Sequence, residues 1–129
     1  MAIRIVQLGT PKRRGEGVRF GTVRRPPRGV RKEDYARQNF YDVWLPNLAP
    51  SARLMAYRGT LDNDGEWKKF SRAYRAEMAR PETSRVIDAL AALSKEANFS
   101  VGCYCEDERR CHRSILRAIL QERGATLAA

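Results

Sequence analysis

The sequence predicts a small α/β domain in which helices pack on a short and mostly parallel sheet. Two periodicities support this fold class. Two segments near the N-terminus alternate apolar and polar residues, as strands do, whereas the middle of the chain repeats apolar residues with the spacing of a helix. A third strand-like segment is then followed, after a short loop, by a closing amphipathic helix. A chain of 129 residues is long enough to form one domain with its own core.

Two strands are predicted at the start of the chain. The segments AIRIVQL, residues 2–8, and VRFGTVR, residues 18–24, alternate and carry β-branched side chains. Between them, GTPKRRGEG contains the glycine and proline residues that are typical of a loop. The next segment, RRPPRG at residues 24–29, is predicted to be extended or turning, because proline disfavours helix in the residue before it.

Three helices are predicted to follow. A short one covers about residues 50–57, from Pro50 or Ser51 to a stop at Gly59. A second has its apolar face at Trp67, Phe70, Tyr74 and Met78. The third begins at Glu82 or Thr83, after Pro81, and its inward face comprises Val86, Ile87, Leu90, Leu93 and Ala97.

The last third of the chain predicts a strand, a loop and a helix. FSVGCYC, residues 99–105, is predicted to be the central strand of the sheet. The closing helix falls within residues 111–122, with Ile115, Leu116, Ile119 and Leu120 facing inward. We assign residues 1–124 to a single α/β domain and expect residues 125–129 to form a flexible tail.

Positive charge is concentrated at the N-terminus. Residues 1–32 contain ten lysine or arginine residues and one acid, Glu16, whereas residues 33–129 are nearly balanced at +1. A local excess of this kind attracts phosphates, nucleic acid or another acidic partner through a salt-sensitive field. An arginine-rich composition that merely keeps two loops solvated is the alternative.

The cellular setting follows from what the sequence lacks. No apolar run approaches the length of a membrane span, and Arg4 interrupts the first apolar segment, so we expect neither a signal peptide nor contact with a membrane. The three cysteines are clustered rather than spread as a disulfide framework would be. We therefore expect a cytoplasmic protein.

The stretch GCYCEDERRCHRS, residues 102–114, contains all three cysteines and the only histidine. It is predicted to run from a strand end to a helix N-terminus, where unpaired amides and the helix dipole favour an anion. The dipole and nearby arginines would favour the Cys111 thiolate, whereas Cys103 would stay protonated on its buried strand. The alternative is a plain turn in which Asp107 or Glu108 caps the helix and takes the same amides.

Zinc has to be considered because Cys103, Cys105, Cys111 and His112 are all residues that can bind it. Structural zinc sites favour pairs of ligands on two separate arms, whereas Cys111 and His112 are adjacent and would have to turn onto one ion. On this spacing we expect no zinc and no other cofactor.

Several motifs resemble the domain of unknown function 488 family, in its YeaO-like branch. They are C-x7-CHRS from Cys103 to Ser114, R-x2-PRG at residues 24–29, a lysine at position 32, Trp44 followed by LAPS at 48–51, and W-x2-F-x3-Y at 67–74. Together they span about residues 18–120. The resemblance implies a compact α/β domain from bacteria or archaea, without an established activity.

The resemblance also implies site residues. The signature loop corresponds to Cys103, Cys111, His112, Arg113 and Ser114, and the second block corresponds to Arg24, Pro27, Arg28 and Gly29. This chain departs from the family pattern at two places. An acid and an aromatic residue that often precede the PRG motif are replaced here by the segment 23–26, and Cys105 stands where many relatives have a glutamate.

Two hypotheses about function remain open. In the first, the 111–114 loop and the 24–29 segment enclose a phosphate-bearing small ligand. Cys111 and His112 are then the candidate catalytic residues, and the candidate ligand-binding residues are Arg24, Arg28, Cys103, Arg113 and Ser114. In the second, the protein is a basic nucleic-acid-associated module and the cysteine loop is structural. The position of the 24–29 segment relative to the 111–114 loop distinguishes the two hypotheses.

Overall fold

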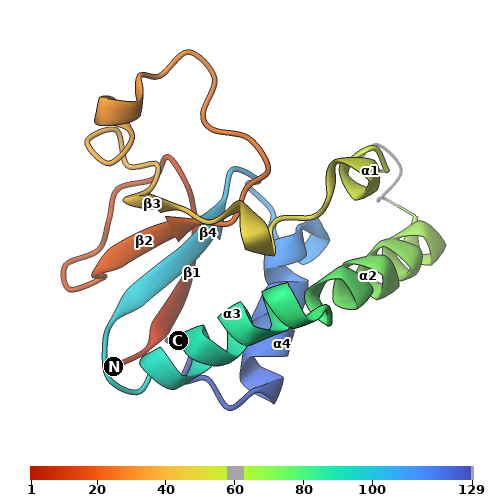
Figure 1. Cartoon of the computed structure of the whole chain (residues 1–129). Coiled ribbons are helices and arrows are strands. Elements are labelled where there is room, and N and C mark those ends of the chain that lie inside the picture. Colours follow the sequence, from red (N-terminus) through yellow and green to blue (C-terminus); the bar gives the residue numbers. More distant parts are fainter. Residues whose placement is uncertain (58–62, 129) are drawn as a thin grey trace.

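The computed structural model describes residues 1–57 and 63–128, and its centre is a four-stranded sheet in the order β1-β4-β2-β3. The strands are β1 (Ile3–Gln7), β2 (Val18–Gly21), β3 (Val43–Trp44) and β4 (Phe99–Cys103). All the paired strands are parallel, and β4 lies between β1 and β2 (Figure 1). The predicted fold class and the central position of the strand at residues 99–105 are therefore confirmed.

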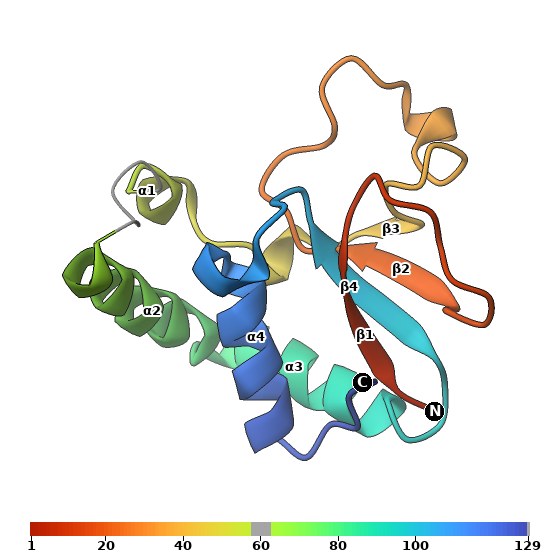
Figure 2. The same cartoon turned by 180° about the vertical axis from the view of Figure 1, so that it is seen from behind.

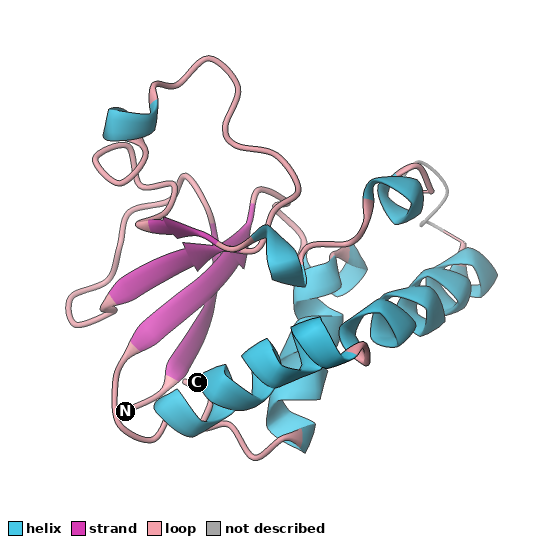
Figure 3. Cartoon of the chain, in the orientation of Figure 1, coloured by secondary structure: helices cyan, strands magenta, loops and turns pink. Residues whose placement is uncertain are grey.

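The register brings several strand ends to one edge of the sheet. Gln7 pairs with Cys103, and Gly21 pairs with Gly102, so β1, β2 and β4 end side by side. The helix α4 (His112–Glu122), drawn with the other helices in cyan in Figure 3, begins beside this edge, since the carbonyl of Thr22, the residue after β2, lies 2.8 Å from His112 Nε2. The residues that follow these strands therefore meet the N-terminus of that helix.

The remaining helices are α1 (Ala52–Met55), α2 (Asp64–Met78) and α3 (Pro81–Leu93). In Figures 1 and 2, α2, α3 and α4 lie together on one side of the sheet. Their predicted apolar faces meet the sheet in one core, whose buried residues include Ile3, Phe70, Tyr74, Met78, Ile87, Leu90, Phe99, Val101, Leu116 and Leu120.

The structure differs from the predicted boundaries of α3 in two respects. The helix begins at Pro81 itself, because the first helical position needs no amide hydrogen. Leu93, predicted to face inward, is the last helical residue and is exposed, and Ala97 lies beyond the helix.

The region between β2 and β3 was least well predicted. The chain leaves the sheet after Gly21, earlier than the predicted end at residue 24, and a long loop extends away from the sheet (orange in Figure 2). It contains a short 3-10 helix, Lys32–Asp34, and leads to β3, which the sequence did not predict. Gly21 must remain small, because a Cβ at this position would lie 2.2 Å from the Tyr41 ring.

The C-terminal residues return to the first strand. The Ile3 amide donates to the Thr126 carbonyl, the Ala128 amide donates to the Ile3 carbonyl, and Leu127 forms a parallel bridge with Ile3. Residues 126–128 thus lie along β1 in the structure, within the segment that we expected to be a tail, and residue 129 lies outside the described residues. Among the described helices, none has the length and apolar character needed to cross a membrane.

Candidate functional site

The candidate site lies where β4 ends and α4 begins. Cys103 is the last residue of β4, Cys111 precedes α4, and His112 is its first residue. The loop between them contains a 3-10 turn, Glu108–Arg110. All three side chains are buried, and the ligand atoms that they offer lie within 4.8 Å of one another.

The acids of the loop do not cap α4. Asp107 accepts a hydrogen bond from the Arg109 amide and so caps the short 3-10 turn, and Glu108 forms an ion pair with Arg117. At the Cys111 end of α4, no side chain of the described residues serves as a cap. The plain capped turn that was the alternative for this helix is therefore not what forms here.

A main-chain carbonyl orients the His112 ring. Nε2 lies 2.8 Å from the Thr22 carbonyl oxygen, which can only accept, so Nε2 carries the hydrogen in the neutral ring. The Thr22 hydroxyl, 3.2 Å from Nε2, is held by the Gly102 carbonyl. Nδ1 then bears the lone pair and lies 3.7 Å from the Cys111 sulfur. The residue directly after β2 thus sets the histidine tautomer.

The three sulfur atoms form a compact group. Cys103 Sγ and Cys105 Sγ are 3.8 Å apart, and none of the three cysteines is in a disulfide. Hydrogen bonds from Cys105 and Cys111, together with burial, raise the pKa of the Cys103 thiol, which agrees with the protonated state expected for it. Its hydrogen bond with Cys103 lowers the pKa of Cys111, but the Cys105 sulfur and burial outweigh that effect and raise it.

The direction of the Cys111 pKa is opposite to our expectation of a stabilised thiolate. The sequence showed the helix terminus and the arginines but not the burial of the side chain, and burial disfavours a charged sulfur.

Arg113 and Ser114 hold the loop rather than pointing to solvent. Arg113 is buried, donates from Nη2 to the Cys105 carbonyl, and lies with Nε 3.5 Å from the Cys111 sulfur. The Ser114 hydroxyl donates to the Cys111 carbonyl at 2.9 Å. Both were predicted to bind a ligand, but these contacts give them a role in shaping the turn around Cys111.

A cavity of about 470 Å³ connects the cluster with the arginine segment. Cys103, His112 and Tyr104 line one part of it, and residues 23–28 line another. The two segments that the sequence singled out, 24–29 and 111–114, therefore lie beside one another. This proximity is what the small-ligand hypothesis required.

The arginines of the cavity differ in what they contact. Arg24 donates to the carbonyls of Pro46, Ala49 and Pro50, so it ties the 46–50 segment to the end of β2. Arg25 and Arg28 are exposed at the cavity and form no ion pair within the described residues. Arg24 and Arg28 were both predicted to bind a ligand. The Arg24 guanidinium is held by backbone carbonyls, whereas Arg28 forms no ion pair within the described residues.

Sequence reasoning missed the roles of three residues in the site. Arg25, which the sequence offered only as one arginine of the basic segment 24–29, lines the cavity, and Thr22 orients His112. Tyr104 donates its hydroxyl hydrogen to the Arg25 carbonyl at 2.9 Å, which fixes the arginine segment to the loop after β4. The adjacent arginines in RRPPRG were a signal for Arg25, whereas the other two roles depend on contacts between distant segments.

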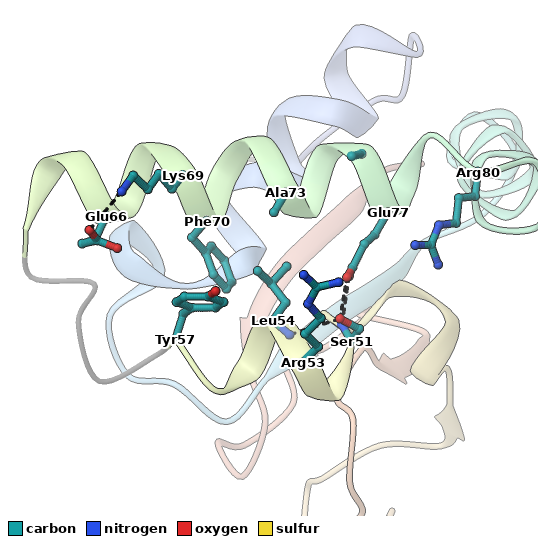
Figure 4. Close-up of a pocket in the computed structure, with 11 residues that line it drawn as sticks. Ser51, Arg53, Leu54, Tyr57, Glu66, Lys69, Phe70, Ala73, Glu77 and Arg80 are labelled. Atoms are coloured by element: carbon teal, nitrogen blue, oxygen red, sulfur yellow. Dashed lines mark hydrogen bonds and ion pairs between the residues drawn. The ribbon is translucent and has the colours of Figure 1, made fainter.

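A second cavity, of about 440 Å³, lies between α1 and α2 (Figure 4). Its carboxylates are already engaged, because Glu77 accepts hydrogen bonds from the Ser51 amide and hydroxyl and Glu66 pairs with Lys69. The contacts of Ser51 with Glu77 fasten the start of α1 to α2, whereas the Glu66–Lys69 pair lies within α2. Among the described residues that line this cavity, none carries a thiol or an imidazole, so the candidate site is the one at the end of β4.

Fold and site together define the class of protein. It is a parallel α/β domain with a thiol–imidazole cluster at the carboxyl end of its central strand, beside an arginine-lined cavity. The family model described as the active DUF488-N3 subclade matches residues 3–124, and the chain therefore belongs to the DUF488 family. Searches of curated proteins and of solved structures found no match. Membership of the YeaO-like branch remains a prediction.

Proposed function

We propose that the protein binds a phosphate-bearing small molecule in the cavity beside β4, and that Cys111 and His112 carry the chemistry of the site. One observation supports this most directly: the same cavity is lined by Arg25 and Arg28 and by Cys103 and His112. Guanidinium groups bind phosphate oxygens through charge-assisted hydrogen bonds. A ligand anchored there would place its remaining atoms near the cluster.

The exposure of the site residues suggests which of them contact the ligand and which hold the surrounding segments in place. Arg25 and Arg28 are exposed at the cavity, His112 and Cys103 form part of its wall, and the Cys111 sulfur lies 3.7 Å from His112 Nδ1. Arg24, Arg113 and Ser114 hold the surrounding segments in place. The description of the matching subclade as active is in keeping with a reactive cluster of this kind.

A nucleic-acid module is the competing proposal, and several contacts weaken it. Arg19 is buried in an ion pair with Glu16, Arg24 binds carbonyl groups, and Lys12 pairs with Asp42. The positive charge of residues 1–32 is therefore less available to a long polyanion than its sum implies. The arginines that remain at the cavity suit a compact ligand better.

The test compares two pairs of arginines by calorimetric titration with inorganic pyrophosphate and with a short DNA duplex. Arg25→Ala/Arg28→Ala should weaken pyrophosphate binding at least about tenfold, because each charge-assisted hydrogen bond contributes about 1.5–3 kcal/mol. Arg13→Ala/Arg14→Ala removes the same charge from exposed residues outside this cavity and should leave pyrophosphate binding unchanged.

Two results would contradict the proposal. Pyrophosphate binding that is equally strong in the Arg25→Ala/Arg28→Ala variant would show that these arginines do not hold the anion. Tight, steeply salt-dependent duplex binding that both double variants weaken alike would favour the nucleic-acid module.

A further inference from the structure

We propose that Cys103, Cys111 and His112 form a zinc site whose fourth position faces the cavity. The sequence-based expectation of no zinc rested on the adjacency of Cys111 and His112, which was expected to keep both from reaching one ion. In the structure the Cys111 sulfur and His112 Nδ1 are 3.7 Å apart, and the ligand atoms of these two residues and of Cys103 lie within 4.8 Å of one another. The objection from spacing therefore no longer holds.

The distances fit tetrahedral coordination. Zinc–sulfur bonds of about 2.3 Å and zinc–nitrogen bonds of about 2.0–2.1 Å place neighbouring tetrahedral ligands about 3.6–3.8 Å apart. The Cys111–His112 separation of 3.7 Å is already within this range. The full group spans up to 4.8 Å, so closure onto an ion needs a side-chain shift of about 1 Å.

The surroundings of the three side chains are those of a metal site. A histidine that binds a metal through one ring nitrogen commonly donates the other N–H to a carbonyl or carboxylate. His112 does this through Nε2 and the Thr22 carbonyl, which leaves the Nδ1 lone pair toward Cys111. Arg113 Nε donates to the Cys111 sulfur and would offset the charge of a thiolate there.

Two cysteines and one histidine leave one position of a tetrahedral zinc ion for another ligand. Cys103 and His112 also line the cavity, so that position is directed toward it. Binding displaces the two thiol protons to solvent, while the neutral imidazole donates its lone pair and keeps its Nε2 hydrogen. An ion held there would polarise the phosphate-bearing ligand of the proposed function, and only this last step rests on that proposal.

Cys105 provides the matched control, because its sulfur is 3.8 Å from Cys103 Sγ but it is not a member of the three-residue group. The experiment measures zinc affinity of the full chain by competition with a chromophoric chelator, in the absence of any phosphate compound. Cys103→Ser and Cys111→Ser should each weaken zinc binding by more than about 100-fold, beyond the loss caused by removing an outer-shell partner. Cys105→Ser removes only an outer-shell contact with Cys103, so it should retain zinc binding far better than the two ligand variants.

A second measurement avoids substitutions, in case a serine variant fails to fold. X-ray absorption of the zinc-loaded unchanged protein should show two sulfur neighbours and at least one imidazole nitrogen. Three sulfur neighbours, or a Cys105→Ser variant that loses zinc, would overturn the open fourth position. A chain that binds no stoichiometric zinc would overturn the site altogether, whereas loss of pyrophosphate binding alone would count only against the proposed function.

Discussion

The central strand β4 contributes to two buried polar clusters, one on each face of the sheet, and the clusters differ in how fully their groups are satisfied. On one face, Ser100 donates to Glu16, which forms a two-point ion pair with Arg19. On the other, Cys103 meets Cys111 and His112. Alternation along a strand explains the separation, because residues 100 and 103 point to opposite faces.

The Glu16–Arg19 cluster has the properties of a structural element. The Arg19 guanidinium donates to both Glu16 oxygens and to the carbonyls of Thr10 and Asn39. The Glu16 carboxylate also accepts from the Ser100 hydroxyl and the Arg13 amide. Opposite charges are thus paired within a network of hydrogen bonds, as a buried ion pair requires.

The cysteine–histidine cluster instead contains weakly hydrogen-bonding thiols whose separations suit a metal ion, and it borders a cavity. The comparison teaches that burial alone does not identify a functional cluster. Groups that are fully matched to one another stabilise the fold, whereas groups that can still accept a ligand are candidates for function.

The largest expected effect comes from breaking the ion pair. Glu16→Ala leaves the buried Arg19 charge without its carboxylate, and removal of one partner of a buried pair costs about 3–5 kcal/mol. Urea unfolding should therefore show a large loss of stability. The paired replacement Glu16→Leu/Arg19→Met removes both charges and should recover most of it; a double variant no more stable than the single one would contradict this account.

The second effect is the dependence of stability on acid. Burial raises the pKa of Glu16, but hydrogen bonds from Arg19, Ser100 and the Arg13 amide outweigh it and lower the pKa from 4.5 to about 2. The carboxylate therefore stabilises the fold fully above pH 4.5. As the pH falls from 4.5 toward 2, about 3 kcal/mol of that stability is lost.

The measurement is urea unfolding across this pH range, with Glu16→Gln as the control. The variant should lack most of the pH dependence of the unchanged protein. Lowered pKa values at Asp107 and Glu122 arise from exposed ion pairs with Arg109 and Arg75, and moderate salt suppresses their contribution. Equal slopes for the unchanged protein and Glu16→Gln would mean that another carboxylate controls acid unfolding.

The third effect is the stabilisation of the folded protein by zinc at the cysteine–histidine cluster. A ligand that binds only the folded state at 100 times its Kd stabilises that state by about 2.7 kcal/mol. Zinc at that excess should stabilise the unchanged protein by this amount and Cys111→Ser by much less, with Cys105→Ser closer to the unchanged protein. A similar shift in all three proteins would indicate binding elsewhere on the chain.

The two clusters were not equally predictable from the sequence. Cys103, Cys111 and His112 lie within ten positions of one another on a predicted strand–loop–helix unit, so their proximity followed from local periodicity. The pairing of Glu16 with Arg19 and Ser100 was not predicted. Ser100 comes from a distant segment, and the excess of basic residues near the N-terminus does not indicate that Arg19 is buried.

In the fold and the cavity too, features with a local sequence pattern were predicted, and features that depend on distant segments were not. Long helices and the central strand have periodic patterns of their own, whereas the two-residue strand β3 exists only because it pairs with β2. The proximity of residues 24–28 to His112 depends on the chain path after Gly21. The structural contacts of Arg24 and Arg113 were not predicted for a related reason: their partners are backbone carbonyls, which no sequence pattern displays.

The smallest expected effect concerns Tyr41, which packs near the cysteine cluster with Leu8, Val23 and Cys103. Among the buried side-chain polar atoms of residues 1–57 and 63–128, its hydroxyl oxygen is the one without a hydrogen-bond partner. Burial, with a smaller effect of Tyr35, raises the pKa of Tyr41 to about 12. The hydroxyl is therefore neutral at physiological pH but still desolvated.

Removal of an unpaired buried hydroxyl relieves a desolvation cost, so Tyr41→Phe should stabilise the protein by about 1 kcal/mol. The expected change in stability is opposite in sign to that of Glu16→Ala. Tyr41→Phe removes a buried polar group that has no partner, whereas Glu16→Ala removes one partner of an ion pair. Urea unfolding at neutral pH measures both variants.

Phe40→Leu, a neighbouring change without a buried polar atom, controls for general repacking. A loss of stability of 1 kcal/mol or more in Tyr41→Phe, about the net contribution of one hydrogen bond, would show that the hydroxyl has a partner such as a bound water, and that the surroundings of Tyr41 are as fully satisfied as the Glu16–Arg19 cluster.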